Sequence, residues 1–337
     1  MKNINVAIIG VSGYTGLELI KILIQHPNFK INYVATSEGD TKLTELHPSL
    51  NSVFEIDVKK VDISEIAEKS ELVFLALPHK TAMEFVQKLM RFENLKIVDL
   101  SADYRLEQKT YEENYLPHID SENLKNSVYG IPELFRKEIS NTRLVANAGC
   151  YPTASILAIL PFLKYKKKGS PIIIDAKSGV SGAGKKCSNS THFVNVNDNM
   201  FAYNPLKHRH SPEIAEKLSQ FGTEKYKVHF VPHLVPVTRG MLSSIYFELE
   251  SEINPIQILK DFYQNEQFIR IRTEPVTMKN TVGTNFCDIF AKSEDNFLYI
   301  ESSIDNLLRG ASSQAVANAN LMFGISEYIG IPVISSF

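Results

Sequence analysis

The chain has 337 residues, of which 44% are hydrophobic and 22% are charged. This composition is ordinary for a globular enzyme, and the length is sufficient for two domains. The 36 basic and 38 acidic side chains nearly balance, which excludes a general attraction for nucleic acid or for an anionic membrane surface. No run of about 18 apolar residues occurs, so no transmembrane helix is expected.

Cysteine usage bears on the compartment and on metal binding. Cys150, Cys187 and Cys287 are odd in number and far apart, a pattern that fits neither a disulfide framework nor a metal site. The N-terminal segment lacks the apolar core and cleavage site of a signal peptide. We therefore expect a cytoplasmic protein without a metal, in a reducing environment that preserves a reactive thiol.

The first half of the chain alternates strand-like and helix-like segments. Short apolar runs predict buried strands, and apolar residues at helical spacing predict amphipathic helices between them. In chain order the predicted elements are a strand at 5–10, a helix at 13–26, strands at 31–36 and 72–77, a helix at 81–92 and a strand at 96–100. Repeated βα units of this kind favour an α/β fold with a doubly wound, Rossmann-type parallel sheet.

The pattern changes after about residue 149. Strand-like segments now follow one another with few helices between them, which favours a mixed or antiparallel sheet in a second, α+β domain. The predicted elements are a helix from 150, strands at 171–176, 227–231, 241–250 and 297–304, a helix at 255–264 and a small-residue helix at 311–323. The Gly/Ser-rich segment 178–190 predicts a loop.

The first predicted βα turn carries three glycines, in the segment GVSGYTG at 10–16. Glycines allow backbone N–H groups to approach a pyrophosphate closely, and the helix N-terminus stabilises its charge. The alternative is a plain βα turn that uses glycine for tight packing. Because the turn opens a βαβ unit, we favour a nucleotide site. Its residues would be Gly10, Ser12, Gly13, Tyr14, Thr15 and Gly16.

The end of the second predicted strand bears on the choice between NAD and NADP. An acidic residue there usually binds the ribose 2′-hydroxyl of NAD. Here Ser37 is a candidate partner for a 2′-phosphate, whereas Glu38 would repel one if it pointed inward, and no arginine is adjacent. His79 follows another predicted strand, and we expect it to border the nucleotide.

Cys150 lies at the start of a predicted helix, in the segment NAGCYP at 147–152. Unpaired N–H groups and the helix dipole lower the pKa of a thiol in this position, and the same N–H groups could hold an oxyanion. The alternative is a small buried hydrophobic residue, which is the usual role of a free cysteine. We assign that structural role to Cys287, which lies in a probable strand.

A thiol nucleophile needs a partner that takes and returns a proton. His208 and His210 precede a predicted helix, and in an extended segment their imidazoles would face the same side. The alternative is an exposed polar loop, and His233 is a weaker candidate. An anionic substrate also needs fixed cations. The candidates are Arg105, Arg209, Arg239 and Lys177.

Several long blocks, which together span nearly the whole chain, resemble a single family. They are GVSGYTGLEL (10–19), DLSADYR (99–105), YGIPEL (129–134), NAGCYPTA (147–154), DAKSGVSGAGK (175–185), HRHSPEI (208–214), VPHLVPVTRGM (231–241) and IDNLLRGASSQAVANANLMFG (304–324). On these blocks the chain resembles the N-acetyl-γ-glutamyl-phosphate reductase family, which is related to aspartate-semialdehyde dehydrogenase.

The resemblance implies an NADP-binding Rossmann domain at 1–148 plus 312–337, and an α+β domain for catalysis and dimerisation at 149–311. It implies Cys150 as the nucleophile and His210 as the general acid/base. The substrate-binding residues would be Arg105 and His208, to which we add Arg209, Asn147 and Lys177. The residues near the nicotinamide would be Ser178, Gly179, Ser181, Gly182 and Asn318.

The resemblance also implies a reaction. It is the NADPH-dependent reduction of N-acetyl-γ-glutamyl phosphate to N-acetylglutamate 5-semialdehyde and phosphate, through a thioester on Cys150, in arginine biosynthesis. The enzyme would be a homodimer or homotetramer. Two alternatives keep the chemistry and change the substrate, to N-succinyl-glutamyl phosphate or to carrier-linked aminoadipyl phosphate, for which the lysine run at 164–168 could offer a basic surface. A further alternative is a nucleotide-sensing regulator on the same fold.

Overall fold

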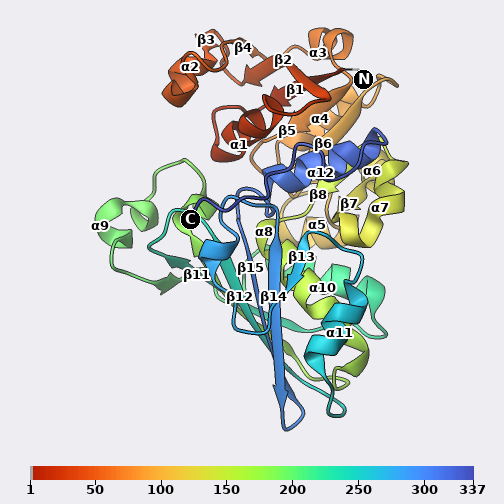
Figure 1. Ribbon diagram of the computed structural model, residues 1–337. Coiled ribbons are helices and arrows are strands. Elements are labelled where there is room, and N and C mark those ends of the chain that lie inside the picture. Colours follow the sequence, from red (N-terminus) through yellow and green to blue (C-terminus); the bar gives the residue numbers. More distant parts are fainter. Residues whose placement is uncertain (1–2) are drawn as a thin grey trace. The chain divides into compact units, whose positions relative to one another are not determined.

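The computed structural model describes residues 3–337, which form two compact units (Figure 1). Unit 1 contains the chain up to Gly149 together with Ala311–Pro332, and unit 2 contains Cys150–Gly310 together with Val333–Phe337. Unit 1 has a doubly wound α/β sheet and unit 2 a mixed sheet with helices, so the predicted fold class is confirmed. Among the described residues, no helix is long and apolar enough to span a bilayer.

Unit 1 alternates strands and helices through most of its length. Its strands are β1 (Ile4–Ile9), β2 (Phe29–Thr36), β3 (Thr41–Lys42), β4 (Asp57–Lys60), β5 (Leu72–Leu75), β6 (Lys96–Asp99), β7 (Val128–Gly130) and β8 (Leu144–Asn147). Its α-helices are α1 (Tyr14–Leu23), α2 (Leu43–Leu46), α3 (Ile63–Lys69), α4 (Ala82–Leu89), α5 (Gln108–Asn114), α6 (Ser121–Asn126), α7 (Pro132–Ser140) and α12 (Ser312–Met322). A 3-10 turn lies at Pro48–Leu50.

These strands form one sheet in the order β3-β4-β2-β1-β5-β6-β8-β7. All neighbouring strands are parallel except β3 and β4. The strand order reverses at β1, because the chain passes from β1 to β2 on one side and later returns to β5 on the other. Ligands of open α/β sheets bind beyond the carboxyl ends of the strands at such a reversal. The topology therefore gives the β1–α1 turn the position expected of a nucleotide site.

The central strands read as uninterrupted apolar runs because helices cover both faces of a parallel sheet. Every residue of β5 and β8 is buried. The core on one face joins Ile9, Val73 and Ile97 from three strands to Val86 and Leu89 of α4. Each such side chain contributes roughly 1.5–3 kcal/mol by leaving water, so this packing fixes the strand ends that carry the loops.

Helix α12 is buried at every position although many of its residues are polar. Its alanines, serines and asparagines allow close packing on α1 and α7, and several of its buried polar groups form hydrogen bonds with neighbouring elements. Ser312 Oγ donates to the Thr15 carbonyl (2.9 Å), and Asn318 Nδ2 donates to the Gly130 carbonyl and to Asn147 Oδ1 (both 3.0 Å). The C-terminal helix is thus tied to α1 and to the end of β8.

Unit 2 begins with α8 (Cys150–Ile159), which continues into a 3-10 segment at Leu160–Tyr165. Its strands are β9 (Ile172–Gly179), β10 (Phe201–Ala202), β11 (Val228–Val235), β12 (Met241–Glu248), β13 (Ile269–Ile271), β14 (Cys287–Glu294) and β15 (Phe297–Ile304). Its other α-helices are α9 (Phe193–Val196), α10 (His210–Phe221) and α11 (Pro255–Phe262). Further 3-10 turns lie at Val180–Ala183, Asn189–Thr191 and Met278–Asn280.

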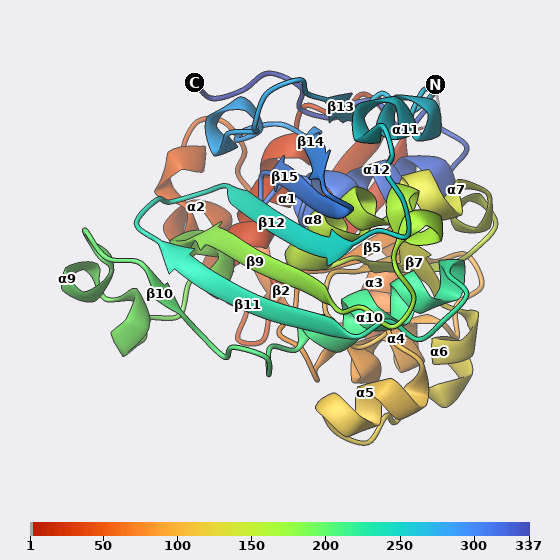
Figure 2. The same ribbon diagram turned by 90° about the horizontal axis from the view of Figure 1, so that it is seen from below.

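The strands of unit 2 form a sheet in the order β10-β11-β9-β12-β15-β14-β13, and Figure 2 shows β11, β9, β12 and β15 lying side by side. The sheet is mixed, as predicted, because β9 pairs parallel with β11 and antiparallel with β12. Helix α8 packs on β12 and β15, where Ser302 Oγ donates to the Ala154 carbonyl (2.9 Å). The helix that begins at Cys150 therefore rests on the centre of this sheet.

Strand register separates two faces of this sheet. Ser302, Ser243 and Ala176 are paired directly across β15, β12 and β9, so all three face α8. Successive side chains of a strand point to opposite faces, and the residues between these positions form what we call the outer face. It includes Ile173, Asp175, Lys177, Leu242, Tyr246, Phe297 and Tyr299.

The predicted strands and helices are all present, with ends shifted by a few residues. The prediction of a loop over the whole of 178–190 is wrong at its start. Ser178 and Gly179 continue β9 and pair with β11, and Val180–Ala183 forms a 3-10 turn. Small residues are typical of loops. Here β11, which is distant in the sequence, offers hydrogen bonds that continue the strand pairing through these small residues.

Candidate active site

Cys150 is the first residue of α8, a helix of 10 residues, and its side chain is half-buried. The first N–H groups of a helix lack partners within it and stabilise an anion, whether a thiolate or an oxyanion. A Cβ atom added to Gly310 would lie 2.5 Å from Cys150 Cβ, so the Asp305–Gly310 segment packs directly against the thiol residue. Cys287 is fully buried on β14, and Cys187 is exposed.

Aromatic rings surround His208 and His210, the two histidines at the start of α10. The ring centroids of His208 and His210 lie 4.9 Å apart. The Tyr151 ring is 5.7 Å from His208 and 5.8 Å from His210, and its hydroxyl is 3.0 Å from that of Tyr203. Tyr203 and Phe230 each contact the His208 ring at 5.4 Å. We call these five residues the aromatic–histidine cluster.

Electrostatic interactions connect the thiol to this cluster. Burial raises the pKa of Tyr203 well above its usual value, and a negative charge on Cys150 raises that pKa further. The same charge contributes to the raised pKa of Tyr151, for which burial is again the main cause. The structure therefore brings the expected nucleophile and both histidines together within unit 2.

His208 is a neutral imidazole near neutral pH. Burial, assisted by the Arg209 guanidinium, lowers its pKa to about 4. Its Nδ1 accepts a hydrogen bond from the backbone N–H of His210 (3.2 Å), so the proton of the neutral ring resides on Nε2. The expectation of an extended segment is wrong, because Arg209 has helical angles (φ −61°, ψ −19°). A helical turn, not strand alternation, brings the two rings together.

Arg209 and Lys177, two cations expected near the substrate, have different surroundings in unit 2. Arg209 is exposed at the start of α10. Lys177 lies on the outer face, where its Nζ pairs with Asp175 (2.8 Å), and His233 contacts the same carboxylate (3.1 Å). Because α8 lies on the opposite face, the structure does not bring Lys177 to Cys150 and gives its expected role in substrate binding no support.

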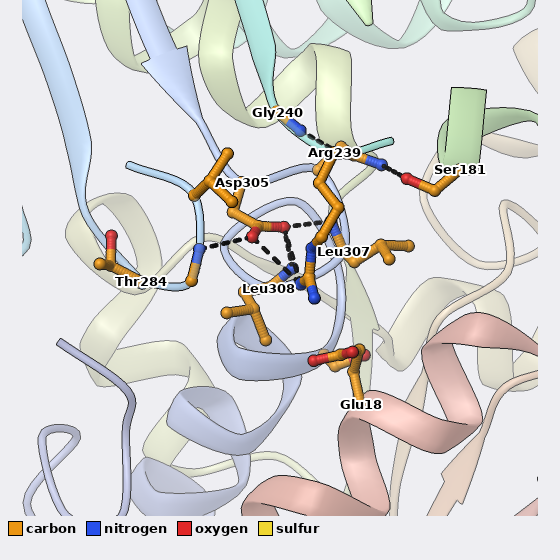
Figure 3. Close-up of polar contacts among 12 residues, drawn as sticks. Glu18, Ser181, Arg239, Gly240, Thr284, Asp305, Leu307 and Leu308 are labelled. Carbon is orange, nitrogen blue, oxygen red and sulfur yellow. Dashed lines mark hydrogen bonds and ion pairs between the residues drawn. The ribbon is translucent and has the colours of Figure 1, made fainter. Parts of the chain in front are cut away.

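The Gly/Ser-rich segment after β9 is held against the turn at 237–240. The backbone N–H groups of Gly179, Val180 and Ser181 donate to carbonyls of this turn, over 2.9, 2.9 and 3.1 Å. The turn itself is anchored by Arg239, whose Nη2 lies 3.1 Å from the fully buried carboxylate of Asp305 (Figure 3). Ser178, Gly179, Ser181 and the adjoining Gly182 therefore form a fixed segment rather than a free loop.

The three glycines of the β1–α1 turn differ in their surroundings. Gly10 has φ +96°, and a Cβ atom there would overlap the Ala76 carbonyl. A Cβ atom on Gly16 would lie 2.6 Å from the Gly10 oxygen. These two positions require glycine for packing. At Gly13 the nearest atom to a Cβ would be the Gly10 oxygen, at 3.9 Å, and Gly13 caps α1 without a side-chain hydrogen bond.

Gly13 is therefore the position of this turn that leaves room for an anion at a helix N-terminus. Its neighbours Ser12 and Tyr14 are exposed, and Thr15 is half-buried. The turn thus combines glycines that pack the chain with an open, polar rim.

The end of β2 meets a basic strand. Ser37 and Glu38 are both exposed, in line with a solvated Glu38 carboxylate. Strand β4 runs parallel to this end, with Lys59 opposite Ala35 and Lys60 opposite Thr36. Lys59 pairs with Glu65. Lys60, which is exposed at the end of β4, therefore lies next to the strand end that Ser37 follows.

The loops after β5 and β6 are joined by hydrogen bonds. His79 Nδ1 accepts from the Ala102 N–H (3.0 Å), and Asp103 accepts from the Lys80 and Ala82 N–H groups (2.7 and 3.0 Å). Burial raises the pKa of Asp99 to about 7, and the Asp103 carboxylate adds to this effect. His79 is thereby fixed at the carboxyl end of the sheet of unit 1, where we expect the nucleotide.

Arg105, Asn147 and Asn318 lie together in unit 1. Arg105 is buried, and it donates from Nε to the Asn147 carbonyl and from Nη2 to the Leu100 carbonyl (both 2.7 Å). Asn147 Oδ1 accepts from Asn318 Nδ2 (3.0 Å), and Asn147 Nδ2 donates to the Ala311 carbonyl (3.1 Å). This cluster holds the end of β8, three residues before Cys150 in the chain.

Sequence reasoning missed Tyr151, Tyr203 and Asn306 as parts of the site. Tyr151 adjoins Cys150 and so carried a local signal. Tyr203 and Asn306 are 53 and 156 positions from Cys150 in the sequence, and only the fold brings them to its surroundings.

Two family models match the chain. Residues 5–142 match "Semialdehyde dehydrogenase, NAD binding domain", and residues 150–306 match "Semialdehyde dehydrogenase, dimerisation domain". A solved aspartate semialdehyde dehydrogenase II from Vibrio cholerae shares the fold at 15% identity, with a TM-score of 0.72 over 96% of this chain and 99% of that one. Fold and family models together define an oxidoreductase of the semialdehyde dehydrogenase class.

Curated relatives narrow this class. N-acetyl-gamma-glutamyl-phosphate reductases from Sulfurimonas denitrificans and Sulfurovum sp. are 59% and 56% identical to this chain, over 99% and 98% of both proteins. The protein of that name from Aquifex aeolicus is 42% identical over 98% of this chain and 97% of its own length. The chain belongs to the N-acetyl-gamma-glutamyl-phosphate reductase family.

Proposed function

We propose that the chain reduces N-acetyl-γ-glutamyl phosphate to N-acetylglutamate 5-semialdehyde and phosphate, with NADPH as the hydride donor, in arginine biosynthesis. The observation that carries the proposal is the half-buried Cys150 at the first position of α8, beside the aromatic–histidine cluster. Relatives named for this substrate reach 59% identity over nearly the whole chain.

The thiolate of Cys150 attacks the acyl carbon, the bond from that carbon to the phosphate oxygen breaks, and phosphate leaves behind a thioester. NADPH supplies, when bound, the hydride that reduces the thioester carbonyl. His210 protonates the resulting thiohemiacetal oxyanion and takes this proton back as the C–S bond breaks, releasing the aldehyde. The N–H groups at the start of α8 stabilise the oxyanion.

The burial of His208 supports His210 as the general acid/base. A pKa of about 4 leaves His208 without a proton to give near neutral pH, since efficient acid/base groups have a pKa near the working pH. His208 can serve the substrate only as a hydrogen-bond donor through Nε2. Arg105 and Arg209 are then the cations that we propose for its anionic groups.

The residues of unit 1 fit a nicotinamide nucleotide. The open space at Gly13 suits a pyrophosphate. Within the described part of the chain, the buried Asn318 Oδ1 accepts no hydrogen bond, and an unsatisfied buried acceptor is costly unless a ligand completes it. The carboxamide of nicotinamide carries the N–H groups that would do so. Ser37 with Lys60 supports NADPH rather than NADH, because a 2′-phosphate needs a positive partner.

Unit 2 supports a homo-oligomer. Its residues 150–306 match a dimerisation domain, and we propose a homodimer, alone or within a homotetramer. A free nucleophilic thiol persists in a reducing compartment, so we place the reaction in the cytoplasm.

Two lysines of the run 164–168 are paired with carboxylates. Lys166 is buried and pairs with Glu224 (3.0 Å), and Lys167 pairs with Glu248 (2.6 Å). Two of the four lysines in this segment thus have acidic partners, which supports a free small-molecule substrate over a carrier-linked one.

The reverse reaction tests the function. N-acetylglutamate semialdehyde, phosphate and NADP should yield NADPH, with a kcat/KM that exceeds those for the N-succinyl analogue and for NAD. Cys150→Ser should abolish the rate, and iodoacetamide should modify Cys150 selectively unless substrate is present. A fully active Cys150→Ser protein would contradict the thioester route, and a preference for the N-succinyl semialdehyde would reassign the substrate.

A further inference from the structure

The segment Asp305–Gly310 links several parts of the thiol site within unit 2. Asp305 is fully buried, and its carboxylate accepts hydrogen bonds from the N–H groups of Gly283 (2.8 Å), Leu307 (2.8 Å) and Leu308 (3.1 Å) besides pairing with Arg239. Charge-assisted bonds of this kind are about twice as strong as neutral ones. The segment is therefore a rigid support (Figure 3).

The next residue, Asn306, has an amide whose orientation is fixed. Its Oδ1 accepts a hydrogen bond from the Gly240 N–H (2.8 Å), and an N–H donor requires the oxygen, not the nitrogen, at that position. The Nδ2 group must then occupy the other side, where it lies 3.0 Å from Ser181 Oγ. Asn306 thus donates to Ser181 and cannot accept from it.

This polarity determines what Ser181 can do. A hydroxyl has one proton, and its oxygen can both accept and donate. Since Ser181 Oγ accepts from Asn306, its proton points away from Asn306 and is available to another acceptor. Ser181 itself is nearly buried, at 9% exposure, so a donor held in this way is shielded from competing water.

The donor belongs to the surroundings of the thiol. A Cβ atom on Gly310 would lie 2.6 Å from the Asn306 carbonyl oxygen and 2.5 Å from Cys150 Cβ, so Asn306 and Cys150 flank the same glycine. On the other side, the Tyr151 hydroxyl interacts with the side chain of Ser178. Both contacts tie the Ser181 segment to the residues that carry the chemistry.

We propose that Asn306 is a positioning residue, which orients the Ser181 hydroxyl as a hydrogen-bond donor to a carbonyl-type oxygen of the bound reactants. This inference rests on the proposed function. Two oxygens have the required chemistry, the carboxamide oxygen of the nicotinamide and the reacting carbonyl of the acyl substrate, and the measurements below separate them.

The test inverts the polarity of Asn306. Asn306→Asp keeps the shape and the bond from the Gly240 N–H, but presents an acceptor to Ser181, whose hydroxyl then turns inward. Ser181→Ala removes the donor without altering Asn306. In each variant either the affinity for NADPH or kcat should fall about 10-fold, the effect of one hydrogen bond. The same quantity should fall no further in the double variant than in either single variant. Asn254→Asp, at an exposed position, is the control for the added charge. It adds the same charge in unit 2, where Asn254 Oδ1 also accepts a backbone N–H (Gln257, 3.2 Å), and should behave as the wild type.

Three readouts are needed. The dissociation constant of NADPH without substrate is measured from cofactor fluorescence, kcat and KM from the reverse reaction, and the integrity of the thiol site from the iodoacetamide rate of Cys150 without ligands. A weaker NADPH complex with an unchanged alkylation rate identifies the carboxamide as the acceptor. An unchanged NADPH complex with a lower kcat identifies the acyl carbonyl.

Other outcomes overturn the inference. They are a Ser181→Ala protein that matches the wild type in every readout, a double variant whose loss is the product of the two single losses, or an Asn254→Asp control that loses as much as Asn306→Asp. If Asn306→Asp fails to fold, Ser181→Ala alone still tests whether the Ser181 hydroxyl is the donor, because this variant leaves the buried amide of Asn306 intact. If the wild-type protein bound NADPH but did not act on the semialdehyde, the proposed function would fail while the NADPH arm of this test remained readable.

Discussion

Burial lowers the pKa of His208 to about 4, and this predicts a role for His208 in the pH dependence of catalysis that differs from the role proposed for His210. We expect His210→Gln to lower kcat by about 10²–10⁴, the usual contribution of a general acid/base, and to remove the ionisation that acid/base catalysis predicts near the working pH in kcat/KM. His208→Gln should leave that ionisation in place, because the pKa of His208, about 4, lies below it. Profiles of kcat/KM for both variants check this, and an unchanged His210→Gln profile would reverse the assignment.

The same burial predicts a stability effect with a definite sign. The pKa of His208 is about 4 in the folded chain and about 6.5 when unfolded. The unfolded state therefore binds more protons between these values, so the free energy of unfolding falls as pH drops from about 6.5 towards 4, by at most about 3 kcal/mol. His208→Phe should flatten this decline in urea titrations. If the free energy of unfolding fell as steeply with pH in the variant as in the wild type, other titratable groups would be responsible for the decline.

Lys60 is the residue on which we expect NADPH selectivity to depend. It lies opposite Thr36 at the end of β2 and is exposed, where it can meet a 2′-phosphate. Lys60→Ala should raise KM for NADPH roughly 10-fold, about one charge-assisted hydrogen bond, and leave KM for NADH unchanged. Lys30→Ala, at the exposed start of β2, is the control. Equal effects on both cofactors would exclude Lys60 as the 2′-phosphate partner.

At this scale the sequence predicted what depends on local chemistry. A cysteine that follows Asn-Ala-Gly and begins a proline-containing helix, or a glycine between a strand and a helix, carries its signal within a few residues. Lys60 and Asn306 carry none, because an exposed lysine in a polar segment and an asparagine in a turn have many structural roles. Only the pairing of β4 with β2 and the bond from Gly240 give them a place in the site.

At the scale of the elements, different glycines of the β1–α1 turn have different roles, some in packing and one in ligand binding. Gly16→Ala would set a methyl group 2.6 Å from the Gly10 oxygen and 2.8 Å from Val11 Cα, and such overpacking costs about 1–3 kcal/mol of stability. Gly13→Ala meets nothing closer than 3.9 Å, in an extended conformation that alanine tolerates (φ −82°, ψ 169°).

Gly13→Ala should therefore unfold at the wild-type temperature but bind NADPH at least about 10-fold more weakly, because the methyl group occupies the space at the helix N-terminus. Gly16→Ala should instead show a lower Tm. Thermal unfolding together with NADPH titration distinguishes the two variants. Normal NADPH binding by Gly13→Ala would indicate that the turn has a purely structural role.

Elements with strong apolar patterns could be predicted and weakly patterned ones could not. The runs at β1, β5 and β6 reflect burial on both faces. By contrast, β4 has the sequence Asp-Val-Lys-Lys with a single buried residue, and β10 and β13 contain two and three residues. Such strands form because a neighbour offers hydrogen bonds, and this depends on residues far away in the chain.

At the scale of the whole molecule, the outer face of unit 2 is the surface on which we expect assembly to depend. The helices that pack on this sheet lie with α8, since α10 contacts α8 and the Tyr263 hydroxyl at the end of α11 bonds to the Leu157 carbonyl (2.5 Å). The outer face carries Ile173 and Phe297, at 42% and 46% exposure, beside the Tyr246 and Tyr299 rings, whose centroids are 5.3 Å apart. Exposed aromatic groups of this kind mark protein interfaces.

We expect two copies to associate through this face. In a two-fold dimer one substitution alters both halves of the interface, so Tyr246→Glu, which sets a carboxylate opposite Ile173 in the strand register, would bury two unpaired charges and should convert the dimer to monomer. Phe262→Glu is the matched control, since Phe262 is also an exposed aromatic residue of unit 2, at 48%, but lies on α11. Sedimentation velocity measures the outcome. A Tyr246→Glu protein that remains dimeric, or a Phe262→Glu protein that dissociates, would move the interface away from the outer face.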